Sequence, residues 1–123
     1  MKAAGVTQGW SMLSPRELTD VHQRAVAEFG VIADENALAE TSQFYKALAD
    51  PTRLRVVALL AVTDLCLCLL VDALSVPSST MTHHLQMLER GGVIVSRRDG
   101  KFTVYALHPD RRAAIIRSLQ SQP

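Results

Sequence analysis

Two cysteines carry the most specific chemistry in this chain. Cys66 and Cys68 are its only cysteines among 123 residues, and one residue separates them. A disulfide that closes so small a loop is strained and stabilises almost nothing, so the pair is not a structural bridge. Closely spaced thiols predict metal binding or redox chemistry. The alternative is that both are small buried apolar side chains.

A second stretch of interest runs from Val76 to Ile94. Read at 100° per residue, it is a helix with two different faces. The apolar side chains form one narrow stripe: Met81, Leu85 and Leu88. Polar side chains occupy the opposite side: Ser79, Thr82, His83 and Gln86. This acid-free face can donate hydrogen bonds to phosphates or read base edges in a major groove, although a merely solvated amphipathic helix would look the same.

A basic hairpin follows that helix. Residues 93–95 predict a strand, residues 102–107 alternate as its return strand, and the segment 97–101 forms the hairpin between them, with Asp99-Gly100 as the tight turn. The hairpin carries three cations: Arg97, Arg98 and Lys101. Such cations contact the DNA backbone or minor groove and add salt-dependent affinity rather than sequence preference.

Composition bounds the class of protein. A chain of 123 residues makes about one domain, and no apolar run approaches the roughly 20 residues that span a bilayer. Charged residues interrupt the apolar residues near the N-terminus, so the uninterrupted apolar core of a signal peptide is absent there. We therefore expect a cytoplasmic protein without a membrane partner. Residues 1–75 carry six basic and nine acidic side chains, whereas residues 76–123 carry seven and three. The basic second half weakly favours a polyanion partner.

Helices must position these features. Ser14, Pro15 and Glu17 predict a helix start, and its apolar positions continue to Gly30. Further helices are predicted over about 33–49 and over 51–62, the latter with Leu54, Val57 and Leu60 inward and Arg53 outward. The apolar segment 64–74 fits a strand or a helix. A turn at 75–77 leads into the acid-free helix, and residues 108–110 cap a last helix.

This order predicts a mainly α protein with a small β-hairpin. Five helices, two strands and a final helix describe a winged helix-turn-helix over residues 14–123, preceded by a flexible arm over residues 1–13. A thiol enzyme is not expected, because the chain lacks a thioredoxin-type C-x-x-C motif and any glycine-rich loop beside the thiols.

Four segments in this order resemble the ArsR/SmtB family of metal- and metalloid-responsive repressors. They are FYKALADPTRLR at 44–55, DLCLC at 64–68, S-x-x-T-H-H-L-x-x-L at 79–88, and G-V-I at 92–94 with R-x-x-G-K at 97–101. The resemblance implies a homodimer on a pseudo-palindromic double-stranded operator. The residues it implies for DNA binding are Ser78, Ser79, Thr80, Thr82, His83, Gln86, Arg97, Arg98 and Lys101. It also implies that the first and last helices pair across the dimer, although a core within one chain would show the same pattern. The candidates are Leu18, Val21, Phe29, Ile115, Ile116 and Leu119.

The resemblance also implies an inducer and no permanent cofactor. The family's arsenic-type motif E-L-C-V-C-D-L-C reads D-L-C-L-C-L-L-V at 64–71, so two thiols are kept and Val71 replaces the third. We expect As(III) or Sb(III) at Cys66 and Cys68, with the third position left to a small thiol, a solvent oxygen or the other subunit. Another thiophilic ion, or redox and reactive-sulfur sensing by the same thiols, stays open as the alternative.

A spacing argument predicts how such an inducer acts. On a regular helix, residues i and i+2 are 200° apart, so Cys66 and Cys68 could share one ion only if the helix unwinds locally. We therefore expect binding to distort the first helix of the DNA-binding pair and to release the DNA.

Overall fold

The computed structural model describes residues 10–120. The chain divides into two compact units, Met1–Leu38 and Ala39–Pro123, each described by itself below. Of the predicted arm, residues 1–9 lie outside the described residues, and residues 10–13 have no regular secondary structure. None of the described helices combines the length and the apolar character needed to cross a membrane. A single domain over residues 14–123 stays a prediction.

The first unit begins with the predicted capping box. Helix α1 (Pro15–Glu28) starts where the Ser14 backbone N–H donates to Glu17 Oε1 at 2.8 Å and the Glu17 N–H donates to Ser14 Oγ at 3.2 Å. A 3-10 turn, η1 (Gly30–Ala33), follows, and α2 (Glu35–Leu48) starts two residues later than predicted. No residue of α1 is buried.

Four helices supply most of the buried side chains of the second unit. They are α3 (Pro51–Val62), α4 (Leu67–Leu74), α5 (Ser78–Arg90) and α6 (Arg112–Gln120). The predicted stripe of α5 is confirmed as core, since Met81, Leu85 and Leu88 are at most 1% exposed. Val56, Val57, Leu60 and Leu70 from α3 and α4 close over it. This burial leaves only the opposite side of α5 free.

The third helix differs from the prediction at one apolar position. Val57 and Leu60 are buried as expected, but Leu54 is 40% exposed. The buried side of α3 is the one that carries Val56, Val57 and Leu60, and Leu54 lies at the edge of that side.

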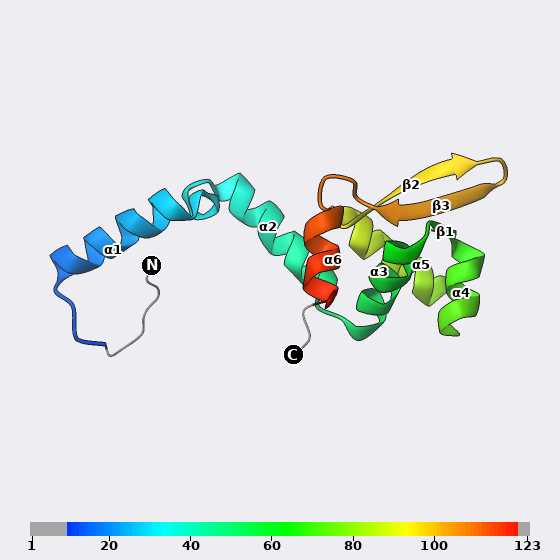
Figure 1. Ribbon diagram of the computed structural model, residues 1–123, viewed down its shortest axis with the longest axis horizontal. Coiled ribbons are helices and arrows are strands. Elements are labelled where there is room, and N and C mark those ends of the chain that lie inside the picture. The colour runs from blue at the N-terminus through cyan, green and yellow to red at the C-terminus, as the bar shows by residue number, and fades with distance from the viewer. Residues whose placement is uncertain (1–9, 121–123) are drawn as a thin grey trace. The chain divides into compact units, whose positions relative to one another are not determined.

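Three strands form an antiparallel sheet in the order β1-β3-β2. Strands β2 (Ile94–Asp99) and β3 (Phe102–Leu107) are the predicted hairpin, which extends along one side of helices α3, α4 and α5 (Figure 1). The predicted turn is wrong by one residue: Asp99 pairs with Phe102, so the loop is Gly100-Lys101, with Gly100 at φ 61°. Arg97 and Arg98 therefore belong to β2.

The apolar segment 64–74, which the sequence pattern left open between a strand and a helix, contains a short strand followed by a helix. Strand β1 (Leu65–Cys66) pairs with β3, with Leu65 opposite Tyr105 and Cys66 opposite Val104, and α4 begins at the next residue. The third strand of the sheet was not predicted, because two residues carry too little pattern to indicate a strand.

Shortening Leu85 to alanine should destabilise the fold. The side chain is 1% exposed, so Leu85→Ala leaves a cavity that costs about 2–5 kcal/mol of unfolding free energy. Val62→Ala is the matched control, because Val62 is 82% exposed and its loss should stay within about 0.5 kcal/mol. Urea unfolding at one protein concentration measures both. Equal losses in the two variants would contradict the assignment of the stripe to the core.

Candidate functional site

The free side of α5 is the first candidate surface. Ser78, Ser79, Thr80, His83 and Gln86 are all exposed, as predicted. Pro77 stands at the N-cap position without a side-chain hydrogen bond, and no acid lies in the first turn. The first backbone N–H groups of α5 therefore remain free for an anion such as a phosphate.

Thr82 differs from the other polar residues of α5. It is half-buried, and its hydroxyl donates to the Ser78 carbonyl at 2.9 Å. A phosphate oxygen can only accept, so this hydroxyl must break its bond within the helix before it can donate to one.

The middle of α5 is tied to the start of α3. The Arg53 guanidinium lies 3.2 Å from His84 Nδ1, and its Nε donates to the Ala47 carbonyl at 2.7 Å. Since arginine only donates, Nδ1 of His84 is the acceptor and the proton of the neutral ring sits on Nε2. Asp50 Oδ2, which accepts the Arg53 N–H, lies 3.9 Å from the same Nδ1. Arg53 is thus not directed outward as predicted, whereas the half-buried His84 is structural.

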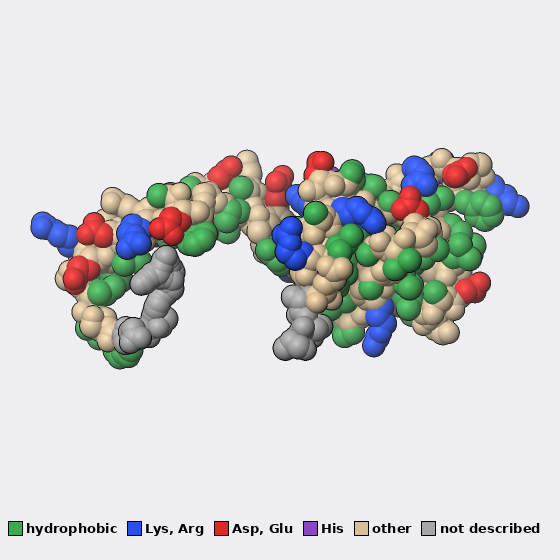
Figure 2. All heavy atoms as spheres, in the orientation of Figure 1, with side chains coloured by type: hydrophobic (Ala, Val, Ile, Leu, Met, Phe, Trp, Pro, Cys, Tyr) green, Lys and Arg blue, Asp and Glu red, His purple; other side chains and the backbone are tan. Residues whose placement is uncertain are grey.

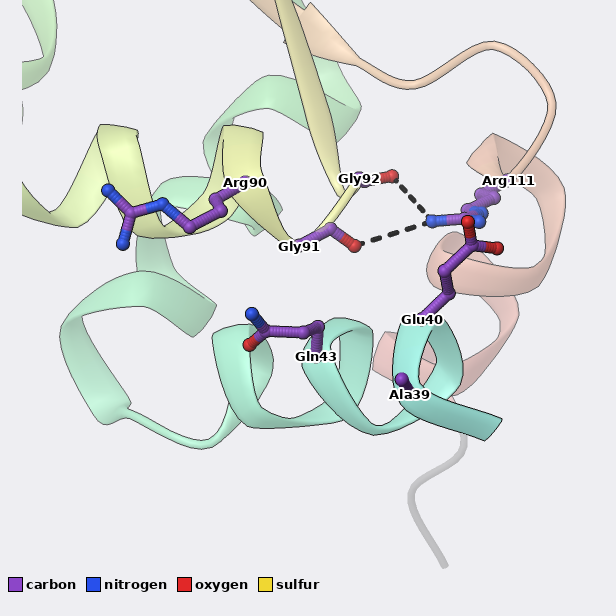
Figure 3. Close-up of a pocket in the computed structure, with 7 residues that line it drawn as sticks. All are labelled: Ala39, Glu40, Gln43, Arg90, Gly91, Gly92 and Arg111. Carbon is purple, nitrogen blue, oxygen red and sulfur yellow. Dashed lines mark hydrogen bonds between the residues drawn. The ribbon is translucent and has the colours of Figure 1, made fainter. Parts of the chain in front are cut away.

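The C-terminal end of α5 is tied to the segment before α6. Figure 3 shows the Arg111 side chain reaching the backbone there, where Nη1 donates to the carbonyls of Gly91 (3.4 Å) and Gly92 (3.0 Å). The same guanidinium stacks 5.0 Å from the ring centre of Phe44 on α2. A hollow of about 310 Å³ lies beside this contact. Arg111 satisfies the carbonyls of the C-cap residue Gly91 and of the next residue Gly92, so its role here is structural.

Both glycines are required at this end of α5. A Cβ on Gly91 would lie 2.6 Å from the Ala47 Cβ, and Gly92 has φ 75°. Their pairing with Arg111 was missed from the sequence, because nearly twenty residues separate the partners and no local pattern joins them.

Each cation of the wing, the β2–β3 hairpin, has a partner within the chain. Arg97 forms an ion pair with Asp64 at 2.9 Å, and Arg98 donates to the Thr103 hydroxyl at 3.2 Å. The Lys101 ammonium lies 5.5 Å from the ring centre of Phe102. Figure 2 shows basic side chains at the outer end of this hairpin, where all three residues are exposed. The partners of Arg98 and Lys101 are uncharged, so these two side chains can offer positive charge to a polyanion, whereas Asp64 balances the charge of Arg97.

The two thiols lie together at the junction of β1 and α4. Cys66 is the N-cap of α4 with extended backbone (φ −88°, ψ 171°), so it does not share the helical rotation of Cys68. The two sulfurs are 3.1 Å apart. The expectation that one ion needs local unwinding is therefore wrong, because the 200° separation applies only when both residues are helical.

The thiols differ in acidity. The hydrogen bond from the Cys68 thiol lowers the pKa of Cys66, and backbone N–H groups at the start of α4 lower it further. The same hydrogen bond raises the pKa of Cys68, and desolvation adds to that rise. Cys66 is half-buried and has the lowered pKa, whereas Cys68 is exposed and has the raised pKa. Among residues 10–120, no three His, Cys, Asp or Glu side chains gather in a way that could hold a metal ion.

Two hollows flank the thiol pair, and both reach the wing. One of about 430 Å³ is largely apolar: its lining residues are Asp64, Leu65, Cys66, Cys68, Leu69, Asp99, Phe102 and Val104. The other, of about 330 Å³, includes Lys101, Thr103 and Tyr105. A ligand held by the thiols would therefore touch the wing as well as α4.

The candidate dimerisation residues fall into two groups. On α1, Leu18, Val21 and Phe29 are 55%, 51% and 62% exposed. On α6, Ile116 and Leu119 are half-buried against the core, and Ile115 is 2% exposed. Ile115 therefore packs inside its own chain and has no surface left for a partner.

Known proteins resemble the part of the chain that contains these surfaces. Residues 48–97 match the family described as a helix-turn-helix domain. The HTH-type transcriptional regulator MJ1325 of Methanocaldococcus jannaschii, itself uncharacterized, is 35% identical over 63% of this chain and 89% of its own length. The cadmium resistance transcriptional regulatory protein CadC of Listeria innocua is 32% identical over 72% of this chain and 76% of its own.

A further relative is the arsenical resistance operon repressor of Escherichia coli K12. It is 40% identical over 54% of this chain, and the chain spans only 58% of that repressor.

Solved structures show the same fold. The homodimeric winged helix-turn-helix DNA-binding domain Mb0332 of Mycobacterium bovis has a TM-score of 0.64 at 22% identity, over 89% of this chain and 87% of its own. HlyU of Vibrio cholerae has a TM-score of 0.62 at 26% identity, over 72% of this chain and all of its own, and a reduced form of HlyU matches similarly.

The acidity difference predicts the pH dependence of alkylation. Because its pKa is lowered, Cys66 should stay reactive toward iodoacetamide at a lower pH than Cys68. Cys68→Ala removes the hydrogen-bond donor to Cys66, so the pH at which alkylation of Cys66 is half-maximal should rise. Alkylation rates from peptide mass spectrometry across pH measure this. Cys66→Ala is the reciprocal control and should lower the midpoint of Cys68; an unmoved Cys66 midpoint in Cys68→Ala would contradict the assignment.

Proposed function

The chain belongs to the ArsR/SmtB family of DNA-binding winged helix-turn-helix regulators, and from that premise we propose that it is a repressor released from its operator when arsenite or antimonite binds Cys66 and Cys68. The family acts by binding DNA and not by catalysis. The observation that carries the inducer is the 3.1 Å separation of the two sulfurs at the start of α4, the helix that precedes α5.

For DNA binding, α5 is the recognition helix. Its exposed side enters the major groove, with Ser78, Ser79, Thr80 and the free N–H groups near phosphates. His83 and Gln86 lie farther along the same side and have the reach for base edges. Thr82 accepts hydrogen bonds there or rotates to donate. The wing cations Arg97, Arg98 and Lys101 contact the sugar-phosphate backbone or minor groove.

The repressor acts as a homodimer on a pseudo-palindromic operator. Two copies place two recognition helices in successive major grooves about one helical turn apart. The exposed apolar side chains Leu18, Val21 and Phe29 of α1, with Ile116 and Leu119 of α6, supply the apolar area that pairing needs. The homodimeric Mycobacterium bovis domain supports this assembly.

The inducer acts where strand, helix and wing meet. Soft thiolates select thiophilic ions such as trivalent arsenic or antimony. Joining the two sulfurs through one ion replaces their hydrogen bond and shifts Cys66, whose backbone pairs with Val104 of the wing. Release follows if this bound state holds α4 and the wing in an arrangement that fits DNA less well. No unwinding of α4 is needed.

A second candidate keeps the repressor and makes the thiols a redox or reactive-sulfur sensor, or a sensor of another heavy-metal ion. The close sulfurs favour it too, and HlyU, which is known in a reduced form, shares the fold. On this reading, mass spectrometry after treatment with peroxide or polysulfide would find the two thiols modified. A mobility shift of the same sample would show loss of DNA binding without any metalloid.

The inducer proposal predicts loss of response without the thiols. Operator DNA, selected from random duplexes by the protein itself, should be released from wild type by arsenite or antimonite but retained by Cys66→Ser/Cys68→Ser. The serine hydroxyls keep the size of the thiols but do not bind soft ions. A mobility-shift series with cadmium, zinc and an oxidant identifies the class of inducer. Release of the double variant by arsenite would overturn the site.

Two substitutions separate base reading from backbone contact. Gln86→Ala should lose about 1–3 kcal/mol on the selected operator and little on random duplex. Arg98→Ala should weaken both about equally and reduce the salt slope by about one. Equal loss by Gln86→Ala on operator and random duplex would contradict a base contact.

A further inference from the structure

The thiol site leaves a trivalent arsenic atom one ligand short. The whole chain has two cysteines, and their sulfurs are 3.1 Å apart. Among residues 10–120, no third histidine, cysteine, aspartate or glutamate lies close enough to the two thiols to hold a metal ion together with them. The described chain therefore supplies two sulfurs to an ion that forms three bonds, and the third bond must come from elsewhere.

The space beside the sulfurs has an apolar lining, for which the three hydroxyl groups of arsenous acid offer no apolar partner. The hollow of about 430 Å³ contains the side chains of Leu65, Leu69, Phe102 and Val104 beside the two thiols. Leu69 and Phe102, from α4 and β3, are 50% and 46% exposed. Apolar side chains left in water on two elements gain free energy when an apolar group covers them.

Two carboxylates, those of Asp64 and Asp99, also line this hollow. Asp64 is paired with Arg97 at 2.9 Å, which balances its charge. Asp99 stands at the end of β2 next to the Gly100-Lys101 loop. The opposite hollow is the one that includes Lys101, Thr103 and Tyr105, so its lining is more polar.

We propose that this thiol site takes a trivalent arsenical that already carries one organic group, and that the group lies in the hollow against Leu69 and Phe102. The inference rests on the proposed metalloid-sensing function and specifies its ligand class. Carbon supplies the third bond to arsenic, so the two sulfurs complete the coordination without another protein ligand. Arsenite would need a solvent oxygen or an added thiol in that position.

The binding reaction balances without an oxidant or a reductant. With phenylarsine oxide as the ligand, two S–H bonds and the arsenic–oxygen bond break. Two As–S bonds form to Cys66 and Cys68, and the oxygen leaves with both protons as water. Arsenic stays trivalent throughout. The two sulfurs are 3.1 Å apart, so both can bond to the same arsenic atom.

The test compares three arsenicals on the full-length chain in a reductant that contains no thiol, so that no small thiol supplies the third bond. Equilibrium dialysis with arsenic detection measures the affinity for phenylarsine oxide, trivalent methylarsenic and arsenite. Wild type should bind both organic forms more tightly than arsenite, by at least about tenfold. Cys66→Ser/Cys68→Ser should bind none of the three.

Matched variants isolate the role of the hollow. Leu69→Ser should reduce the phenyl-to-methyl affinity ratio about fivefold, because part of the ring's apolar contact is lost. Phe102→Thr tests the other side in the same way and keeps a residue suited to a strand. Val62→Ser removes an aliphatic side chain that is 82% exposed and does not line the hollow, so it should leave the ratio unchanged. Using the ratio cancels the different intrinsic reactivity of the two arsenicals.

The failures of the two proposals differ. Arsenite binding as tight as that of the organic forms, or a ratio that neither Leu69→Ser nor Phe102→Thr changes, would overturn the organic ligand and leave the metalloid-responsive repressor standing. Absence of binding by every arsenical in wild type, or equal binding by the double serine variant, would overturn the thiol site itself.

Discussion

The burial of one side of α5 is the constraint on which the rest of this structure depends. Met81, Leu85 and Leu88 leave water by packing against α3, α4 and β2, and that packing decides which side of α5 stays free. Two polar contacts then hold the helix along its length. Arg53 holds its middle through His84, and Arg111 holds its end through the carbonyls of Gly91 and Gly92. The exposed side of α5 is therefore presented by a helix with little freedom to rotate.

The position of the thiol pair is set by the junction of β1, α4 and the wing. Cys66 ends a strand, caps a helix and pairs with the wing, so one residue belongs to three parts of the domain. Its sulfur meets that of Cys68 because the backbone is extended at one cysteine and helical at the next. A change at this point acts on α4 and on β3 together, through covalent continuity on one side and backbone hydrogen bonds on the other. The proposed binding at the thiols would therefore act on the wing through the backbone pairing of Cys66 with Val104.

Local sequence patterns predicted most of the architecture. The Ser14–Glu17 capping box, the helix start at residue 51 and the stripe of α5 depend on neighbours within a few residues, and each is present. The hairpin was predicted from alternation and a glycine, with its turn displaced by one residue because Asp99 is compatible with both strand and loop. Strand β1 was not predicted, since a two-residue strand exists only through its partner β3.

The sequence by itself determined the residue types: two thiols and no third, an acid-free helix face, and a basic hairpin after it. These follow from composition and short-range periodicity, which side-chain chemistry and backbone geometry dictate locally. Only the tertiary structure decided the distance between the sulfurs, the hollow between α4 and the wing, and the inward placement of Arg53 and Ile115. Those features arise between segments far apart in the chain. Their positions depend on how whole elements pack, and no local pattern records that.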